Sequence, residues 1–210
     1  TVLIIENHYL ASVIKTGQFD TFYQEHPRTY SVKSFIKISS SLGLNIHNIE
    51  FPKRYGGNIR VFMNKLQNKV IPTEKLNKLI EDEQYIIESS HDWNEKIVKW
   101  RNETNFKLKE LQNKGIKIAG KAFPARASII INLLGINENT IPVIFEKPGS
   151  KKIGHYVPGT KIKIIDEEDM NDYDAIVNFA WHINGEIITS LKESGFKNTI
   201  YTILPMLKKV

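Results

Sequence analysis

Hydrophobic and polar positions alternate in patterns that divide the first part of the chain into short strands and helices. Residues 1–6 are apolar and mostly β-branched, which is typical of a buried parallel strand. Residues 9–16 repeat with helical spacing. Residues 31–42 form the clearest early helix, because Ser31 is a good N-cap and Gly43 is a good terminator.

Two alternating segments, residues 44–51 and 58–64, come next. The connection between them, residues 52–57, begins with proline and ends with two glycines, which is typical of a turn. The pattern therefore predicts an antiparallel hairpin.

Residues 70–114 are polar overall and carry apolar stripes with helical spacing. Trp93 and Trp100 are seven positions apart, so they share one helix face. A shared face predicts core packing or an interface rather than a platform for stacking bases. We expect two helices here that bridge two lobes.

Residues 115–210 alternate between strand-like and helical patterns, and such alternation predicts a parallel, Rossmann-like sheet. The predicted strands are 116–119, 141–145, 175–179 and 199–204, and the predicted helices are 125–134 and 184–194. The fold class is therefore α/β. We expect three parts: residues 1–69, a helical linker over 70–114, and a second α/β domain over 115–210.

Composition narrows the possible functions. The chain has 210 residues, 41% of them hydrophobic, with no cysteine and a formal net charge of +6. The lack of cysteine excludes disulfides and cysteine-bound metal within the chain. No apolar run is long enough to span a membrane and no signal-peptide pattern is visible, so a cytoplasmic location is the default expectation.

The modest positive charge suits an anionic ligand such as a nucleotide sugar, but it equally suits a basic surface that only confers solubility. Nucleic-acid binding is a weaker alternative, because no block of Arg and Lys is interleaved with aromatic residues. Such binding would show itself as a strong dependence of affinity on salt.

The most reactive combination of side chains is Tyr23-Gln24-Glu25-His26, which falls on a predicted loop. Histidine is the side chain whose ordinary pKa lies nearest neutrality, and a neighbouring carboxylate can orient it as a general base. The alternative is a solvated polar loop or the start of a helix.

Residues 19–26, together with 30–35, resemble the segment FDTxYxEHxxxxS of sugar-nucleotide C-methyltransferases, which methylate a carbon of a keto-deoxysugar with S-adenosylmethionine. The resemblance implies that His26 is the base. Pro27 and Arg28 depart from the family pattern, and the proline stiffens the backbone directly after His26.

Residues 56–61 resemble the family segment GGSLRV. The resemblance implies that Asn58 and Arg60 contact the substrate, with the guanidinium meeting a phosphate or a sugar hydroxyl. The alternative for Arg60 is a solvated side chain on an edge strand.

Three segments in the second half also resemble family motifs: residues 120–128 (GxGAPAKGN), 146–160 (DxNPxKQGxYTPGT) and 181–187 (WNxxxEI). By this resemblance Arg126, Tyr156 and His182 are expected to bind the diphosphate and the sugar. For His182 a helix-capping role is an equal alternative. Lys151 and Lys152 are expected to lie on a solvated loop.

The resemblance implies a fold and a mechanism. Residues 1–6 would be the fifth strand of a class I methyltransferase sheet, and the hairpin its antiparallel edge. The half that mainly binds S-adenosylmethionine, and the family's zinc module before it, are not in this sequence, so we expect the isolated chain to be inactive. His26 would remove the acidic proton beside the ketone, Glu25 would orient His26 or hold the sugar, and Tyr23 would bond the enolate oxygen.

The alternative function is a non-catalytic remnant that binds a nucleotide sugar or pairs with another subunit. The sequence does not indicate the sugar, the nucleotide, the methylated carbon or the oligomeric state.

Overall fold

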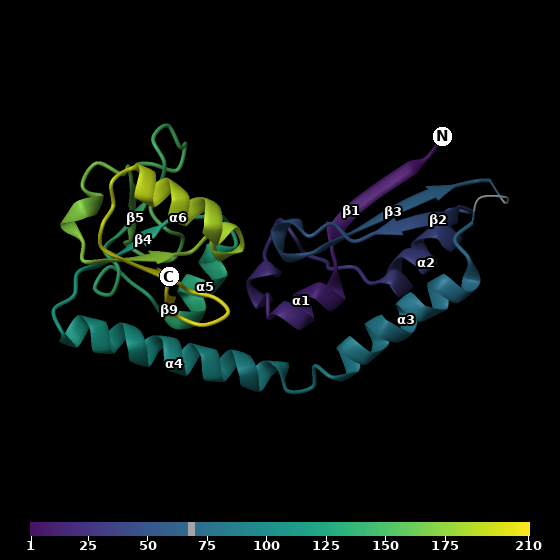
Figure 1. Cartoon of the computed structure of the whole chain (residues 1–210), viewed down its shortest axis with the longest axis horizontal. Helices are drawn as coiled ribbons and strands as arrows, with labels where there is room; N and C mark the ends of the chain where they lie inside the picture. The colour runs from purple at the N-terminus through teal and green to yellow at the C-terminus, as the bar shows by residue number, and fades with distance from the viewer. Residues whose placement is uncertain (67–69) are drawn as a thin grey trace. The chain divides into compact units, whose positions relative to one another are not determined.

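The computed structural model describes residues 1–66 and 70–210. The chain divides into two compact units, Thr1–Glu95 and Lys96–Val210, which are described separately (Figure 1). The domain boundary predicted between residues 69 and 70 touches positions 67–69, which lie outside the described residues.

The first unit contains a three-stranded antiparallel sheet in the order β1-β3-β2. Its strands are β1 (Leu3–His8), β2 (Asn45–Glu50) and β3 (Asn58–Asn64). The predicted hairpin is confirmed, because β2 and β3 are antiparallel neighbours. The alternative that placed Arg60 on an edge strand is wrong, because β3 lies between the other two strands.

The prediction of a buried parallel strand over residues 1–6 is wrong for the described part of the chain. Strand β1 pairs only with β3 in this sheet, and that pairing is antiparallel. Val2, Leu3 and Ile4 remain 47%, 39% and 54% exposed. The apolar pattern predicted burial because it does not reveal whether a second strand is present to cover the other edge.

Three helices, α1 (Leu10–Thr16), α2 (Val32–Ser41) and α3 (Thr73–Glu88), lie along one face of this sheet (Figure 1). The core between helices and sheet includes Phe35 of α2 and Val61 of β3. Ser31 caps α2 as predicted, since its hydroxyl accepts the Ser34 N–H at 3.0 Å.

A buried carboxylate joins α3 to the start of α2. Glu83 accepts the N–H groups of Val32 at 2.5 Å and Lys33 at 3.4 Å, which lack partners within the first turn of the helix. Burial, followed by the nearby charge of Glu83, raises the pKa of Tyr9 well above its ordinary range. The two hydrogen bonds place the Glu83 carboxyl at the positive end of α2.

The second unit contains a six-stranded sheet in the order β6-β5-β4-β7-β8-β9. All neighbouring pairs are parallel except β8 with β9. The strands are β4 (Ile118–Lys121), β5 (Val143–Phe145), β6 (Lys163–Ile165), β7 (Ala175–Asn178), β8 (Thr199–Thr202) and β9 (Lys208–Lys209). The predicted α/β class is thus confirmed. Strands β6 and β9 were not predicted, because both are very short.

The helices of this region are α4 (Trp93–Asn113), α5 (Ala127–Leu134) and α6 (Asn184–Glu193). Trp100 is buried as predicted, and its indole N–H donates to the Ile203 carbonyl at 3.1 Å. Leu191 of α6 packs in a core with Ile176 and Ile200 of the sheet. No helix in the described ranges is both long enough and apolar enough to cross a membrane.

The direction of strand addition reverses between β4 and β7. The chain goes from β4 to β5 and β6 on one side, and from β7 to β8 on the other. Ligands of open parallel sheets bind outside the carboxyl ends of the strands at such a point. The two loops that leave these ends are residues 122–126 and 179–183.

We predict that Glu83→Gln lowers the free energy of unfolding by about 1–3 kcal/mol, because the amide cannot provide two strong acceptors to the start of α2. Chemical denaturation of the variant and the wild type measures the difference. The exposed neighbour Glu81 supplies the control, because Glu81→Gln removes the same charge from the same helix. Equal stability of both variants would show that the cap contributes little.

Candidate active site at the carboxyl end of the first strand

The loop that carries the predicted base is attached to the end of β1. The main-chain N–H of Leu10 donates to the Tyr30 carbonyl at 2.9 Å, and the Tyr30 N–H donates to the His8 carbonyl at 3.4 Å. Tyr9 and Tyr30 also form an isolated β-bridge. These contacts return the chain to the carboxyl end of β1 before α2 begins.

The structure brings the three predicted catalytic residues together on this loop. The main-chain N–H of His26 donates to the Tyr23 carbonyl at 2.9 Å and closes a turn. The Tyr23 hydroxyl donates to Glu25 at 3.2 Å, and the rings of Tyr23 and His26 meet edge to face with centroids 5.3 Å apart. Glu25 is exposed, whereas Tyr23 and His26 are half-buried. Their catalytic roles remain a prediction.

His8 is a site residue that the sequence reasoning missed. It is the last residue of β1, is 8% exposed, and contacts His26 edge to face with ring centroids 4.6 Å apart. The available signal was the polar triplet Glu6-Asn7-His8, which follows the apolar run and so falls at a strand end. The sequence predicts a strand that stops at residue 6, which leaves Asn7 and His8 outside it, whereas β1 continues to His8.

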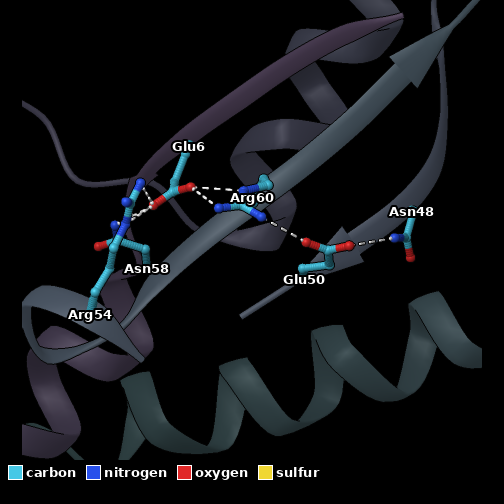
Figure 2. Close-up of polar contacts among 6 residues, drawn as sticks. All are labelled: Glu6, Asn48, Glu50, Arg54, Asn58 and Arg60. Atoms are coloured by element: carbon cyan, nitrogen blue, oxygen red, sulfur yellow. Dashed lines mark hydrogen bonds and ion pairs between the residues drawn. The ribbon is translucent and has the colours of Figure 1, made fainter. Parts of the chain in front are cut away.

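A network of charged side chains crosses the sheet beside this strand end (Figure 2). Glu6 accepts hydrogen bonds from Asn58 at 2.8 Å, Arg54 at 2.8 Å and Arg60 at 2.7 Å. Arg60 also donates to Glu50 at 3.0 Å. The guanidinium of Arg60, expected to meet substrate, is thus held between two carboxylates of its own sheet.

These contacts set the charge state of Glu6. The hydrogen bond from Asn58, followed by those from Arg54 and Arg60, lowers the pKa of the Glu6 carboxyl to about 2 against the opposing effect of burial. Asn58, the other predicted substrate residue on β3, is buried, and its carbonyl oxygen has no partner among the described residues.

The turn between β2 and β3 requires its two glycines. A Cβ at Gly56 would lie 2.2 Å from the amide nitrogen of Gln18, and one at Gly57 would lie 2.6 Å from the Ser12 hydroxyl. Both glycines also have positive φ, of 87° and 115°. The turn therefore packs tightly against the region of α1, which fixes the position of Arg54 relative to Glu6.

A second group of predicted residues meets at the strand reversal of the second unit. Arg126 is 5% exposed, and its guanidinium lies 5.2 Å from the centre of the Trp181 ring. The His182 ring contacts Trp181 edge to face at 6.0 Å. Trp181 therefore joins two expected ligand residues, Arg126 and His182, that come from different loops. Tyr156 is exposed and forms an isolated β-bridge with Lys163.

The loop after β4 is held by side chains that follow β5. Glu146 accepts the Phe123 N–H at 2.7 Å, and Lys152 donates to the Phe123 carbonyl at 2.6 Å and to Glu146 at 3.3 Å. Lys152 lies on an exposed loop, as expected, with its side chain 46% exposed, but its ammonium also bonds this loop. Lys121 is also buried and pairs with Glu167.

Comparison with known proteins now identifies the family. A family model described as "C-methyltransferase C-terminal domain" matches residues 53–205, which is more than half of the chain. The chain belongs to this C-methyltransferase family. The family resemblance found in the sequence is thereby confirmed.

A curated relative agrees with this assignment. The chain is 25% identical over 200 residues to the C-methyltransferase NovU of Streptomyces niveus, and the match covers 91% of this chain. It covers 47% of NovU, so the chain spans about half the length of this relative.

We predict that Glu6→Gln lowers the free energy of unfolding at pH 7 by about 1–2 kcal/mol, a figure reduced to allow for solvent screening of exposed Arg54. Because the folded-state pKa is depressed, the stabilisation is full above pH 4.5 and is lost as the pH falls towards 2. Wild type and variant should therefore converge in denaturation series run from pH 5 down to pH 2.

The control for this series is Glu50→Gln, which removes a more exposed carboxylate from the same network. Its cost should be smaller. A cost for Glu6→Gln that persists at pH 2 would mean that side-chain shape, and not charge, accounts for the effect.

Proposed function

We propose that this chain is the C-terminal part of an S-adenosylmethionine-dependent C-methyltransferase acting on a nucleoside-diphosphate keto-deoxysugar. The observation that carries the proposal is the meeting of His26, Tyr23 and Glu25 in one turn at the carboxyl end of β1. The phenol contacts both the imidazole and the carboxylate, and these three groups are those needed to form an enolate from a ketone.

The arrangement of both sheets supports the proposed folds. The order β1-β3-β2, with β3 antiparallel to both neighbours, agrees with the last three strands of a class I methyltransferase sheet. The exposed apolar residues of β1 fit an edge that continues into further strands. In the second unit, the reversal of strand order between β4 and β7 supports a Rossmann-like domain.

The described residues do not fit a site for the cofactor. A glycine-rich loop between a strand and a helix is the usual cradle for such a group. The described junction after β1 is Tyr9 alone, and the loop after β4, residues 122–126, contains no glycine. We infer that S-adenosylmethionine is bound by a part of the protein outside this chain, as is any zinc module. Within the described ranges, no group of three potential metal ligands occurs.

In the proposed reaction the substrate ketone acidifies the hydrogen on the adjacent carbon. His26 takes that proton, and the electron pair of the C–H bond moves to form the enolate. In this proposal the Tyr23 hydroxyl turns from Glu25 to donate a hydrogen bond to the enolate oxygen, and the charge of Glu25 stabilises the imidazolium. S-adenosylmethionine, bound outside this chain, would supply the methyl group to that carbon and would leave as the demethylated thioether. A well-placed base contributes about 10²–10⁴-fold to such a step.

Candidate ligands of the sugar nucleotide are proposed for each unit by itself. In the second unit we assign the diphosphate to Arg126, with His182 and Tyr156 as contacts to the sugar. In the first unit the buried carbonyl oxygen of Asn58 supports a role as a hydrogen-bond acceptor. Arg60 would have to leave Glu6 or Glu50 to bind an anion.

A non-catalytic role as a sugar-nucleotide-binding or subunit-pairing protein is not favoured. The family match and the relationship to NovU both indicate a methyltransferase. Nucleic acids and membranes are not among the proposed partners.

We predict that His26→Ala abolishes proton abstraction in the complete enzyme while sugar binding stays within a few-fold. The assay incubates enzyme and keto-sugar nucleotide in D₂O and follows deuterium uptake at the acidic carbon by mass spectrometry. Glu25→Gln should slow uptake less, because its amide still accepts a hydrogen bond from Tyr23 but cannot stabilise a charged imidazole. Normal uptake in His26→Ala together with loss in Glu25→Gln would transfer the role of base to the carboxylate.

We predict that Arg126→Ala weakens nucleotide-sugar binding by about 1–3 kcal/mol, the range for charge-assisted hydrogen bonds. Calorimetry with nucleoside-diphosphate sugars measures this change. The matched variant Arg126→Lys keeps the charge and should lose less. An unchanged dissociation constant in Arg126→Ala would place the diphosphate elsewhere.

A further inference from the structure

We propose that His8 is a positioning residue that holds the imidazole of His26 for proton abstraction. The inference rests on the proposed function for its catalytic consequence, but its structural part can be tested separately. His8 is the last residue of β1, and its ring contacts the ring of His26 directly. Such an arrangement makes the strand end one wall of the candidate site.

The His26 ring lies in contact with two aromatic rings. His8 meets it at a centroid distance of 4.6 Å and an interplanar angle of 79°, and Tyr23 meets it at 5.3 Å and 72°. Edge-to-face contacts of this kind favour one relative orientation of the rings. Tyr23 belongs to the same turn as His26, whereas His8 belongs to β1, so within the described ranges the contact with His8 ties the imidazole to the sheet.

His8 is itself held rigidly. It is 8% exposed, and its main-chain carbonyl accepts the Tyr30 N–H at the far end of the loop. Across the sheet His8 is in register with Asn58, whose amide donates to Glu6 at 2.8 Å. A base placed on a flexible loop gains precision when its ring rests on a strand fixed in this way, because a displacement of about 1 Å can cost 10²-fold in rate.

A second histidine, His47, makes a comparable ring contact away from the candidate site and can serve as a control. His47 lies on β2, and its ring contacts Phe62 with centroids 5.8 Å apart. Strand β3 separates β2 from β1 in the sheet. Loss of the His47 ring therefore removes a similar aromatic contact without touching His26.

The structural part of the proposal is tested by NMR on the 210-residue chain. Wild type should show nuclear Overhauser effects between ring protons of His8 and His26, and between those of His26 and Tyr23. In His8→Phe the ring contact should persist, whereas in His8→Ala the effects between His26 and Tyr23 should weaken. His47→Ala should leave them intact. Unchanged His26–Tyr23 effects in His8→Ala would overturn the proposal.

The catalytic part is tested by deuterium uptake in the complete enzyme. His8→Ala should lower kcat for exchange by about 10- to 100-fold with KM for the sugar nucleotide within about 3-fold, since only the base is misplaced. His8→Phe should restore the rate to within about 3-fold of wild type. A purely structural role would instead lower thermal stability in His8→Ala and His47→Ala alike without a selective loss of kcat.

Failure of the proposed function and failure of the positioning role of His8 give different results. Absence of deuterium uptake in the wild-type enzyme would refute the proposed function, while the NMR comparison would still decide whether His8 positions His26. Uptake that is normal in His8→Ala, or equally poor in His8→Phe and His8→Ala, would overturn positioning by ring contact.

Discussion

The buried carboxylate of Glu83 is the contact on which the arrangement of the first unit depends. It satisfies main-chain N–H groups at Val32 and Lys33, so α3 is bound to the start of α2. The residue immediately before that helix start is the capping Ser31, and Tyr30 before it is bonded to the end of β1. The exit of the loop that carries His26 is therefore fixed from two directions, by a helix on one side and a strand on the other.

The sheet supplies the other fixed side of the candidate site. Glu6 binds three side chains at once, and its pKa of about 2 keeps it ionised throughout the neutral range. Because Arg54 comes from a turn that only glycine at positions 56 and 57 can form, one carboxylate locks the turn, β3 and β1 together. A partly exposed ion pair is worth little alone, but a network with several hydrogen bonds to one carboxylate restrains geometry more strongly. We infer that this network serves to keep the end of β1, and hence His8, in place.

The sequence predicted the fold best where local residues mark the start or the end of a helix. The helix predicted over residues 31–42 is observed as Val32–Ser41, because Ser31 and Gly43 act within one turn of it. Contacts between residues far apart in the sequence were not predictable. The pairing of Arg60 with two carboxylates requires the cross-strand register of the sheet, and the contact of His8 with His26 requires the loop to return to β1. The motif around His26 identified the candidate residues, while their mutual orientation came only from the fold.

In the second unit, the loop after β4 limits how an anionic ligand can be bound. In many nucleotide-binding α/β folds, free main-chain N–H groups in the loop after the first strand hold the phosphates. Here the Phe123 N–H is occupied by the carboxylate of Glu146, which Lys152 in turn neutralises. Under the proposal, the diphosphate at this edge is held by a side chain, that of Arg126, whose guanidinium lies over the Trp181 ring. A planar guanidinium gives two parallel donors to phosphate oxygens, which is a geometric reason for arginine, rather than the lysine of the resembling motif, to serve at this position.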